Sequence, residues 1–387
     1  MAEVGIDEVT IILLPEESLL NTPDRRWDDL AWGIVLEAEE RLNLCAILGE
    51  RKLMEKAISG YTIGFSYGDH DFFFAVCYHG YFPKMGVMIK FSAQALAYYQ
   101  GQTNMFLYEI LQQAQSPLYR VRCSRIDIAI DFINEGVSIN EIHSDYLDDK
   151  LFIMVMRERN GFIEQVRKRY ELNSISHDSE FETLMFGKRD SPVMLRIYNK
   201  KVEQISKRGS RYTEALQYDD WVRFEAEAKQ EYAHGLSDLL LSIESDNEFK
   251  ETILGFFIQK FYFMILDDDK YITAPFMQKI IDLKNDRSIT LIKSTSHKNT
   301  ELAKSIIHLL KTSGTITTLY KAAEIWGEEG LLDFAKEIIQ FLKCYEPNQD
   351  CKRFLKNNKE DYRRLYSDFN IFYETEIKPE MEDDSSS

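Results

Sequence analysis

The chain has 387 residues, with 47 Lys and Arg against 64 Asp and Glu, and therefore a formal net charge of −17. Its hydrophobic fraction of 44% excludes a disordered chain and is typical of a folded protein of two or three domains. No apolar run reaches the roughly 18–20 residues of a membrane span, and the acidic N-terminus lacks the features of a secretion signal. The five cysteines form no CxxC pair, which argues against a disulfide framework or a structural zinc site. We therefore expect a soluble, cytoplasmic protein.

Hydrophobic periodicity predicts an α+β fold, in which an antiparallel β-sheet domain with flanking helices precedes a helical C-terminal domain. Residues 1–60 are predicted to be an acidic helical N-terminal extension, with an apolar stripe between residues 30 and 48. Short aromatic, β-rich runs begin at Tyr61 and indicate a β-rich domain that extends to residue 240. Residues 241–373 have a helical pattern, and the acidic tail 374–387 is predicted to be disordered.

Charge is spread unevenly along these segments. Residues 1–55 hold 13 acids and 5 bases, whereas residues 187–211 hold 8 bases and 2 acids. An acidic total opposes indiscriminate nucleic-acid binding, because it repels phosphate at long range. The basic middle stretch is compatible with a DNA contact at a chosen surface. It is also compatible with a solvated basic loop, and charge alone favours the loop.

Three segments that are far apart in the sequence show clean strand alternation: 121–132, 193–200 and 222–229. Because successive side chains on a strand point to opposite faces, each segment has one apolar face and one polar face. The polar faces carry the following side chains: Arg125, Asp127 and Asp131; Arg196, Tyr198 and Lys200; Arg223, Glu225, Glu227 and Lys229. If the three strands lie in one sheet, a single surface collects four carboxylates, several basic groups and one tyrosine.

The carboxylates of these strands are paired along each strand. Asp127 with Asp131, and Glu225 with Glu227, place like charges on one face, where they repel unless Arg residues or a cation lie among them. Converging carboxylates suit a hard divalent ion such as Mg²⁺ or Mn²⁺. For any single strand, the simpler interpretation is a polar face in water with cross-strand ion pairs.

The run FGKRDSPVMLRIYNKK, preceded by SRIDIAID and followed by VRFEAEAK, resembles the Rep_trans family. These proteins are rolling-circle plasmid replication initiators and the related relaxases of integrative conjugative elements. The resemblance covers about residues 61–232 and implies a bacterial enzyme that nicks and rejoins one DNA strand, at the start of replication or conjugative transfer. It places the nucleophile at Tyr198 and metal ligands at Asp127 and Glu225, and the further candidate ligands are Asp131 and Glu227.

The implied reaction agrees with the chemistry of these side chains. A tyrosine phenol that attacks a phosphodiester forms a 5′-phosphotyrosyl link and frees a 3′-hydroxyl, so the bond energy is kept for rejoining. A divalent cation, Mg²⁺ or Mn²⁺, would polarise the phosphate. Arg196 and Lys200 flank Tyr198, and we expect them to lower the phenol pKa from about 10 and to contact phosphates. The other candidate DNA contacts are Lys188, Arg189, Lys201 and Arg223.

The resemblance also implies partners, namely origin or transfer-origin DNA, a host helicase of the PcrA type and a second copy of the chain in a homodimer. Two alternatives stay open: a non-catalytic origin-binding protein on the same fold, and a metal-dependent nuclease that activates water while Tyr198 positions the substrate. A glycosidase built on paired carboxylates gains no support from the basic context. Residues 313–339 have the pattern of a helix–turn–helix with Gly327 in the turn, although generic helical packing is the favoured interpretation.

Overall fold

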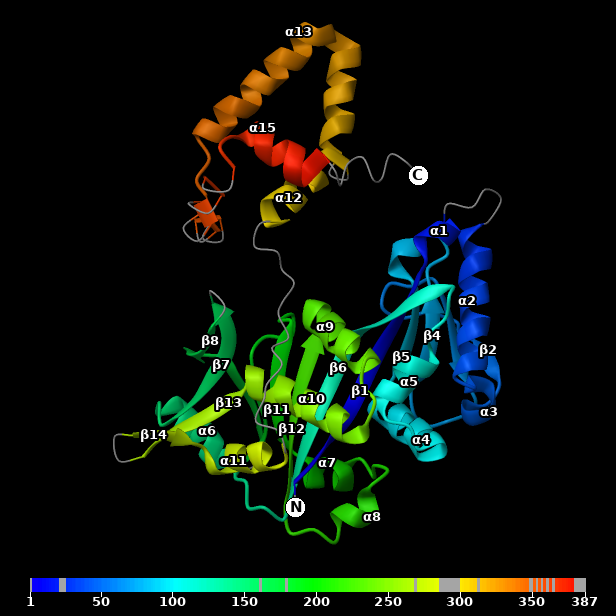
Figure 1. Ribbon diagram of the computed structural model, residues 1–387, viewed down its shortest axis with the longest axis vertical. Coiled ribbons are helices and arrows are strands. Elements are labelled where there is room, and N and C mark those ends of the chain that lie inside the picture. The colour runs from blue at the N-terminus through cyan, green and yellow to red at the C-terminus, as the bar shows by residue number, and fades with distance from the viewer. Residues whose placement is uncertain are drawn as a thin grey trace. The chain divides into compact units, whose positions relative to one another are not determined.

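A computed structural model of the chain describes residues 2–20, 26–159, 162–177, 180–267, 270–284, 300–311 and 314–347, and residues 351–378 with gaps at 353, 356–357, 360–361 and 364–365. The chain divides into two compact units, Met1–Ser294 and Thr295–Ser387. The first unit combines a large sheet with helices, and the second unit is helical (Figure 1). The predicted α+β class with a helical C-terminal region is thereby confirmed.

The first unit is built on a ten-stranded antiparallel sheet with the order β2-β3-β4-β5-β1-β6-β12-β11-β10-β9. Its strands are β1 (Ala2–Pro15), β2 (Arg51–Leu53), β3 (Ile63–Tyr67), β4 (Phe74–Tyr78), β5 (Val87–Phe91), β6 (Tyr119–Ile133), β9 (Leu172–His177), β10 (Glu180–Phe186), β11 (Val193–Asn199) and β12 (Trp221–Lys229). A smaller sheet has the order β14-β13-β7-β8. Its strands are β7 (Leu151–Arg159), β8 (Phe162–Lys168), β13 (Tyr262–Asp267) and β14 (Lys270–Thr273).

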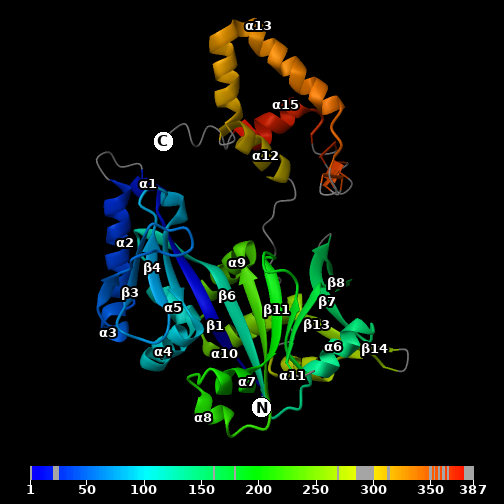
Figure 2. The same ribbon diagram turned by 180° about the vertical axis from the view of Figure 1, so that it is seen from behind.

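The helices α9, α10 and α11 lie in front of the large sheet in Figure 1, and Figure 2 shows strands β1, β6 and β11 from the opposite side. The helices of this unit are α1 (Glu17–Leu20), α2 (Trp27–Arg41), α3 (Leu44–Leu48), α4 (Ala93–Thr103), α5 (Leu107–Gln113), α6 (Ile139–Leu147), α7 (Lys200–Ser206), α8 (Tyr212–Ala215), α9 (Gln230–Leu241), α10 (Asp246–Lys260) and α11 (Pro275–Asp282). The apolar faces of the central strands form the core beneath the helices. Phe224 of β12 is fully buried, and its ring packs against Phe257 of α10 and Phe276 of α11.

The N-terminal segment differs from the prediction of a helical extension. Residues 2–15 form the central strand β1, which pairs with β5 on one side and with β6 on the other, where Ala2 lies opposite Phe132. The predicted apolar stripe corresponds to α2 and α3. The prediction is wrong for β1 because a short apolar run has no period that separates a strand from a helix. Both faces of the run are covered, since Ile11 lies in the main core and Ile12 in a second apolar cluster with Met88.

The segment after residue 240 also differs from the prediction. It contains strands β13 and β14, and the first compact unit continues to Ser294 rather than ending near residue 240. The run FYFMIL at 261–266 is again a short apolar stretch that periodicity cannot assign. It becomes a strand because its partner β7, more than 100 residues earlier, offers an open edge, with Phe263 opposite Ile153.

The second unit is described on its own. It contains α12 (Thr300–Lys311), α13 (Thr315–Lys343) and α15 (Phe369–Phe372), followed by a π-helical turn at Tyr373–Ile377. Gly327 interrupts α13 with a φ of 71°, a left-handed conformation that glycine adopts without strain, at the position of the predicted turn. The first residues of the predicted disordered tail, 374–377, are helical, because they belong to the π-helical turn. Residues 379–387 of that tail lie outside the described residues. Among the helices of the described ranges, none is long and apolar enough to cross a membrane.

Candidate active site

The three strands predicted to share a polar surface are neighbours in the large sheet. β12 lies between β6 and β11, and the register places Glu227 opposite Asp127 and Glu225 opposite Arg196. The side chains of this face are buried rather than solvated, because Asp127 is 0% and Glu225 is 2% exposed. The interpretation of these strands as polar faces in water is therefore wrong for the carboxylates, whereas the cross-strand ion pairs that it included are present.

Two further acids reach this face from β1, and the sequence analysis missed them. A register shift between Ile6 and Val9 in the pairing of β1 with β6 brings Asp7 and Glu8 to the polar side together. The Asp7 carboxylate contacts the guanidinium of Arg223, and that of Glu8 lies 3.1 Å from Arg125 and 3.3 Å from Lys90. A β-bulge of this kind breaks the alternation of a strand, so period-two reasoning cannot anticipate it.

Arg125 and Arg196 separate the carboxylates at the centre of the face. Arg125 donates two hydrogen bonds to Asp127, at 2.9 and 2.6 Å, and lies 3.4 Å from Glu227. Arg196 contacts Glu225 directly and lies 3.6 Å from Asp127. These guanidinium groups offset the repulsion that directly opposed acids impose on a sheet.

Arg223 forms a second group at one side of this centre. Its guanidinium donates to both carboxylate oxygens of Asp131, at 2.7 and 2.6 Å, and also contacts Asp7. Arg223 is only 8% exposed, and both of its sides face carboxylates. This arrangement contradicts the predicted DNA contact at Arg223. It also places Asp131 apart from the Asp127 and Glu225 carboxylates, with Arg223 as its counter-ion.

Tyr198 is held at the end of β11 by the local sequence. The next residue, Asn199, caps α7 by accepting a hydrogen bond from the Val202 amide at 3.0 Å, so the strand ends and the helix begins directly after the tyrosine. Lys200 is then the first residue of α7, and its Nζ donates to the Tyr198 hydroxyl at 3.4 Å. The hydroxyl itself donates to Oε2 of Glu225 at 3.1 Å.

The electrostatics of the site differ from expectation for the tyrosine. Burial and the nearby Glu225 charge raise the pKa of Tyr198 above its usual value, so the expected lowering by Arg196 and Lys200 is wrong. Burial, together with the repulsion of Asp7, also raises the pKa of Glu225. Burial and the repulsion of Glu225 raise the pKa of Asp127 in spite of its hydrogen bonds to Arg125. Burial therefore outweighs the neighbouring arginines in setting the pKa of both carboxyl groups.

The same carboxylates are also candidate ligands for a cation. Asp127, Glu225 and Glu227 offer hard oxygen donors, and the raised pKa values of Asp127 and Glu225 indicate an environment that additional positive charge would stabilise. Arg196 currently bridges two of these groups. Within the described ranges, no three His, Cys, Asp or Glu side chains are gathered as a preformed metal site. These oxygen donors suit a divalent cation, which would displace Arg125 and Arg196 from the carboxylates on binding.

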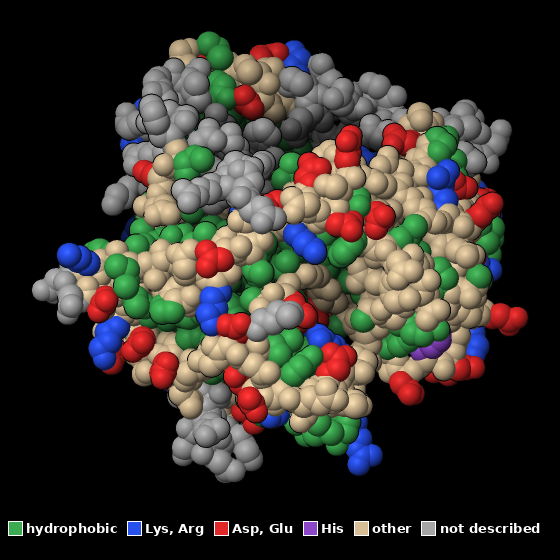
Figure 3. Space-filling model, turned by 60° about the horizontal axis from the view of Figure 1, so that its bottom comes forward, with side chains coloured by type: hydrophobic (Ala, Val, Ile, Leu, Met, Phe, Trp, Pro, Cys, Tyr) green, Lys and Arg blue, Asp and Glu red, His purple; other side chains and the backbone are tan. Residues whose placement is uncertain are grey.

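The remaining predicted DNA contacts lie outside this centre. Lys188 and Arg189 are exposed in the turn between β10 and β11, where Lys188 lies 3.5 Å from Glu171. The half-buried Lys201 donates to the backbone carbonyl of Asp219 at 3.1 Å. On the face shown in Figure 3, acidic and basic side chains are interspersed between hydrophobic patches. The roles predicted for these lysines and for Arg189 stay predictions.

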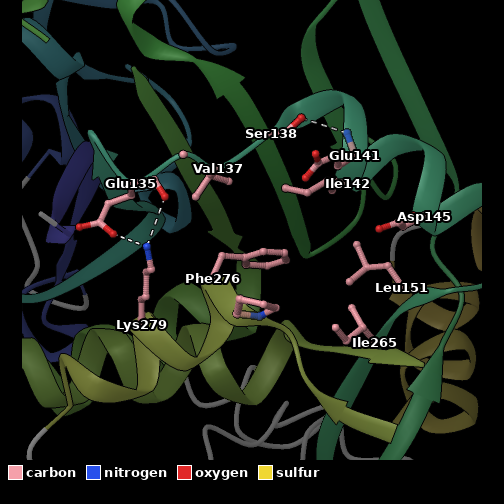
Figure 4. Close-up of a pocket in the computed structure, with 12 residues that line it drawn as sticks. Glu135, Val137, Ser138, Glu141, Ile142, Asp145, Leu151, Ile265, Phe276 and Lys279 are labelled. Atoms are coloured by element: carbon pink, nitrogen blue, oxygen red, sulfur yellow. Dashed lines mark hydrogen bonds and ion pairs between the residues drawn. The ribbon is translucent and has the colours of Figure 1, made fainter. Parts of the chain in front are cut away.

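A separate pocket of about 270 Å³ lies between α6, β13 and α11. Val137, Ile142, Leu151, Ile265 and Phe276 form its apolar lining (Figure 4). On its rim, Lys279 pairs with Glu135 and holds the pKa of that carboxyl at about 2. None of the residues that line the pocket is a predicted site residue.

The fold is that of a rolling-circle replication initiator. A solved structure described as the rolling circle replication initiator protein from Geobacillus stearothermophilus superposes with a TM-score of 0.51 and 18% sequence identity, over 75% of this chain and 100% of that chain. The family model Rep_trans, replication initiation factor, matches residues 121–330, which is more than half of the sequence. The chain therefore belongs to the Rep_trans family of replication initiation factors. No curated protein matches the chain.

Proposed function

We propose that the protein nicks and rejoins one strand of DNA with Tyr198 as the nucleophile, and thereby starts rolling-circle replication or conjugative transfer. The observation that carries the proposal is the hydrogen-bonded series from Lys200 through the Tyr198 hydroxyl to Glu225, on the face that holds the family motif. The nucleophilic hydroxyl contacts a proton acceptor, Glu225, and a positively charged group, Lys200, and these are the two partners that activate a weakly acidic nucleophile.

In the proposed reaction, the Tyr198 oxygen attacks the scissile phosphorus while its proton passes to Glu225. The bond from phosphorus to the 3′-oxygen breaks, that oxygen takes a proton from water, and a 5′-phosphotyrosyl link remains. The Tyr198 hydroxyl already donates to Oε2 of Glu225 at 3.1 Å, so the proton has an acceptor within hydrogen-bond reach. Lys200 offsets the negative charge that develops on the phenol oxygen. Reversal of the same steps rejoins the strand without another energy source.

A divalent cation, Mg²⁺ or Mn²⁺, would be held by Asp127, Glu225 and Glu227 and would supply polarisation of the scissile phosphate. Arg196 lies within the same group and would then be free to contact a neighbouring phosphate. Asp131 is not included, because it belongs with Arg223 and Asp7 to the separate group at one side of the centre.

Replication initiation makes DNA the partner of the chain. A host helicase of the PcrA type and a homodimer are further proposals that rest on the family resemblance alone. The exposed Lys188 and Arg189 on the β10–β11 turn are proposed as backbone contacts for DNA that approaches the site.

Covalent capture tests the proposal. The protein is incubated, in the presence of Mg²⁺ or Mn²⁺, with supercoiled plasmid that carries the gene encoding this protein and the flanking DNA. Denaturing gels then show whether nicked circles and a protease-sensitive protein–DNA adduct have formed. We expect the adduct with the wild-type protein and with Tyr218→Phe, a matched tyrosine variant outside the series. Tyr198→Phe should bind the DNA and form no adduct.

The other outcomes are equally informative. An adduct that persists in Tyr198→Phe would exclude this tyrosine as the nucleophile. Nicking that leaves free 5′-phosphate ends and no adduct would indicate a nuclease that activates water. A footprint on the same plasmid without any nicking would indicate an origin-binding protein that lacks catalysis.

A further inference from the structure

The pocket between α6, β13 and α11 has an apolar floor (Figure 4). Phe276 of α11 belongs to this floor, and its ring packs against Phe224 and Phe263 at centroid distances of 5.3 and 5.2 Å. The buried Ile142 and Leu151 also belong to it. Its volume of about 270 Å³ lies below the roughly 300–1,000 Å³ of sites for drug-sized ligands, and it suits one large side chain.

The apolar surface continues from the pocket across the small sheet. Leu151 of β7 is paired with Ile265 of β13, which is paired in turn with Ile272 of β14. Paired residues of neighbouring strands point to the same face, so the three side chains form one row. The row begins at the buried Leu151 and ends at Ile272, which is 41% exposed. A pocket that opens onto an exposed apolar surface is typical of a protein docking site.

Two carboxylates without a counter-ion border this pocket on α6. Glu141 and Asp145 are four residues apart on the helix, so they lie on the same side of it and repel each other. Neither side chain forms an ion pair with the part of the chain that the structure describes. Lys279, across the pocket, is already paired with Glu135 (Figure 4). A basic group from outside would therefore find two acids to pair with.

The walls of the pocket are fixed by hydrogen bonds. The Ser138 hydroxyl caps α6 by accepting from the Glu141 amide at 3.2 Å. The Glu135 amide donates to the Asp220 carboxylate at 3.2 Å, and Lys279 donates to the Glu135 carbonyl at 3.3 Å. These bonds tie α11 to the loop before α6. An occupant would meet a site that is already formed, so little conformational entropy would be lost on binding.

The floor of the pocket and the candidate active site lie on opposite faces of the large sheet. Phe276 packs against Phe224 of β12, whereas the next residues on that strand, Arg223 and Glu225, point to the other face. An occupant of the pocket can therefore be present together with DNA at the active site. The acids of α6 also repel phosphate, so the pocket does not extend a DNA-binding surface.

We infer that this pocket docks a segment of a protein partner in which an apolar side chain lies between basic residues. The apolar side chain fills the pocket, and the flanking Lys or Arg side chains pair with Glu141 and Asp145. A second copy of this chain is a poor source of such a segment, because a net charge of −17 opposes its approach to an acidic surface. The inference does not depend on the proposed nicking function.

The test measures the binding of three short peptides to the full chain by fluorescence anisotropy. The peptides carry the same label and differ only in a central Lys-Phe-Lys, Lys-Ala-Lys or Glu-Phe-Glu. We expect Lys-Phe-Lys to bind about 10-fold or more tightly than Lys-Ala-Lys, because alanine leaves the pocket unfilled. We expect it to bind about 5-fold or more tightly than Glu-Phe-Glu, because glutamates are repelled by Glu141 and Asp145.

Two variants of the chain assign this binding to the pocket. Val137→Phe places a ring in the pocket and should reduce Lys-Phe-Lys binding to the level of Lys-Ala-Lys. Glu141→Gln/Asp145→Asn removes the charges and should make Lys-Phe-Lys and Glu-Phe-Glu bind alike. Glu324→Gln/Glu328→Gln is the matched control, since these acids of α13 are exposed and also four residues apart. Urea midpoints show that each variant is folded, and the isosteric acid variant still tests the inference if Val137→Phe is unstable.

Equal binding of the three peptides would overturn the inference, and so would Lys-Phe-Lys binding that both pocket variants leave unchanged. Phenethylamine carries a ring and an ammonium group in one small molecule. If it competes as well as unlabelled peptide, the pocket takes a small organic cation and the inference fails. Self-association of the wild-type chain that Val137→Phe abolishes would assign the pocket to a second copy and overturn the inference as well. Covalent capture with Val137→Phe should match wild type, so this inference and the nicking proposal fail independently.

Discussion

Replacement of Arg223 by Met should destabilise the first unit more than any surface ion pair could. The methionine fills much of the same space, but it removes three charged hydrogen bonds and leaves Asp131 and Asp7 facing each other beside Tyr198. Asp131 is 6% exposed, so water cannot replace the lost partner. Breaking a buried pair from one side costs about 3–5 kcal/mol, most of it from the uncompensated charge that remains.

The assay is urea unfolding at pH 7, followed by tryptophan fluorescence, which Trp221 at the start of the same strand reports locally. With a slope near 3 kcal/mol per molar, we expect the midpoint to fall by about 1 M or more. The control is Lys150→Met, which removes a pair with Asp148 whose side chains are 61% and 57% exposed. That change should cost less than about 1 kcal/mol.

The loss of unfolding free energy in Arg223→Met should depend on pH, and this dependence identifies its cause. In Arg223→Met two carboxylates stay buried without a cation, and a buried charge destabilises the folded state only while it is charged, so the destabilising effect is complete at high pH and fades as acid neutralises the charge. The difference from wild type should therefore shrink between pH 7 and about 4. A loss no larger than that of Lys150→Met, or a loss that does not change with pH, would refute the assignment of a buried charge pair.

Three further predictions follow from the same site. Glu225→Gln should flatten the stability profile at pH values above the ordinary range of a carboxyl group, because the raised folded-state pKa values of Glu225 and Asp127 contribute stability at low pH that is lost as the pH rises through them. An unchanged profile of urea midpoints would contradict this. Asn199→Ala removes the α7 cap and should cost about 1 kcal/mol while slowing adduct formation through displacement of Lys200, whereas Asn199→Asp should restore both. Removal of divalent ions with EDTA should abolish adduct formation and leave DNA binding intact, and adduct formation at an undiminished rate in EDTA would exclude the proposed cation.

The sequence predicts the chemistry-bearing strands well because each of them alternates cleanly. β6, β11 and β12 begin and end within two residues of the predicted segments, and their polar faces meet as expected. The contribution of β1 could not be predicted, since its apolar run has no period and its bulge at Asp7 and Glu8 breaks the alternation. The predicted lowering of the Tyr198 pKa is wrong for a related reason. Charge signs are visible in a sequence, whereas burial, which dominates here, appears only when the strands pack.

The central position of β1 has a consequence for how the chain is made. The strand leaves the ribosome well before its neighbour β6, which follows only after more than 100 further residues and pairs Phe132 with Ala2. At ordinary synthesis rates that interval is roughly 6–25 s, during which the edge of this apolar strand that pairs with β6 stays unpaired, even after β5 has emerged to pair with the other edge. Folding must also close this long loop before the sheet gains its central contacts, which slows it. Nascent chains of this protein are therefore expected to engage chaperones until β6 emerges, and yield should depend on expression temperature more than the stability of the finished sheet would suggest.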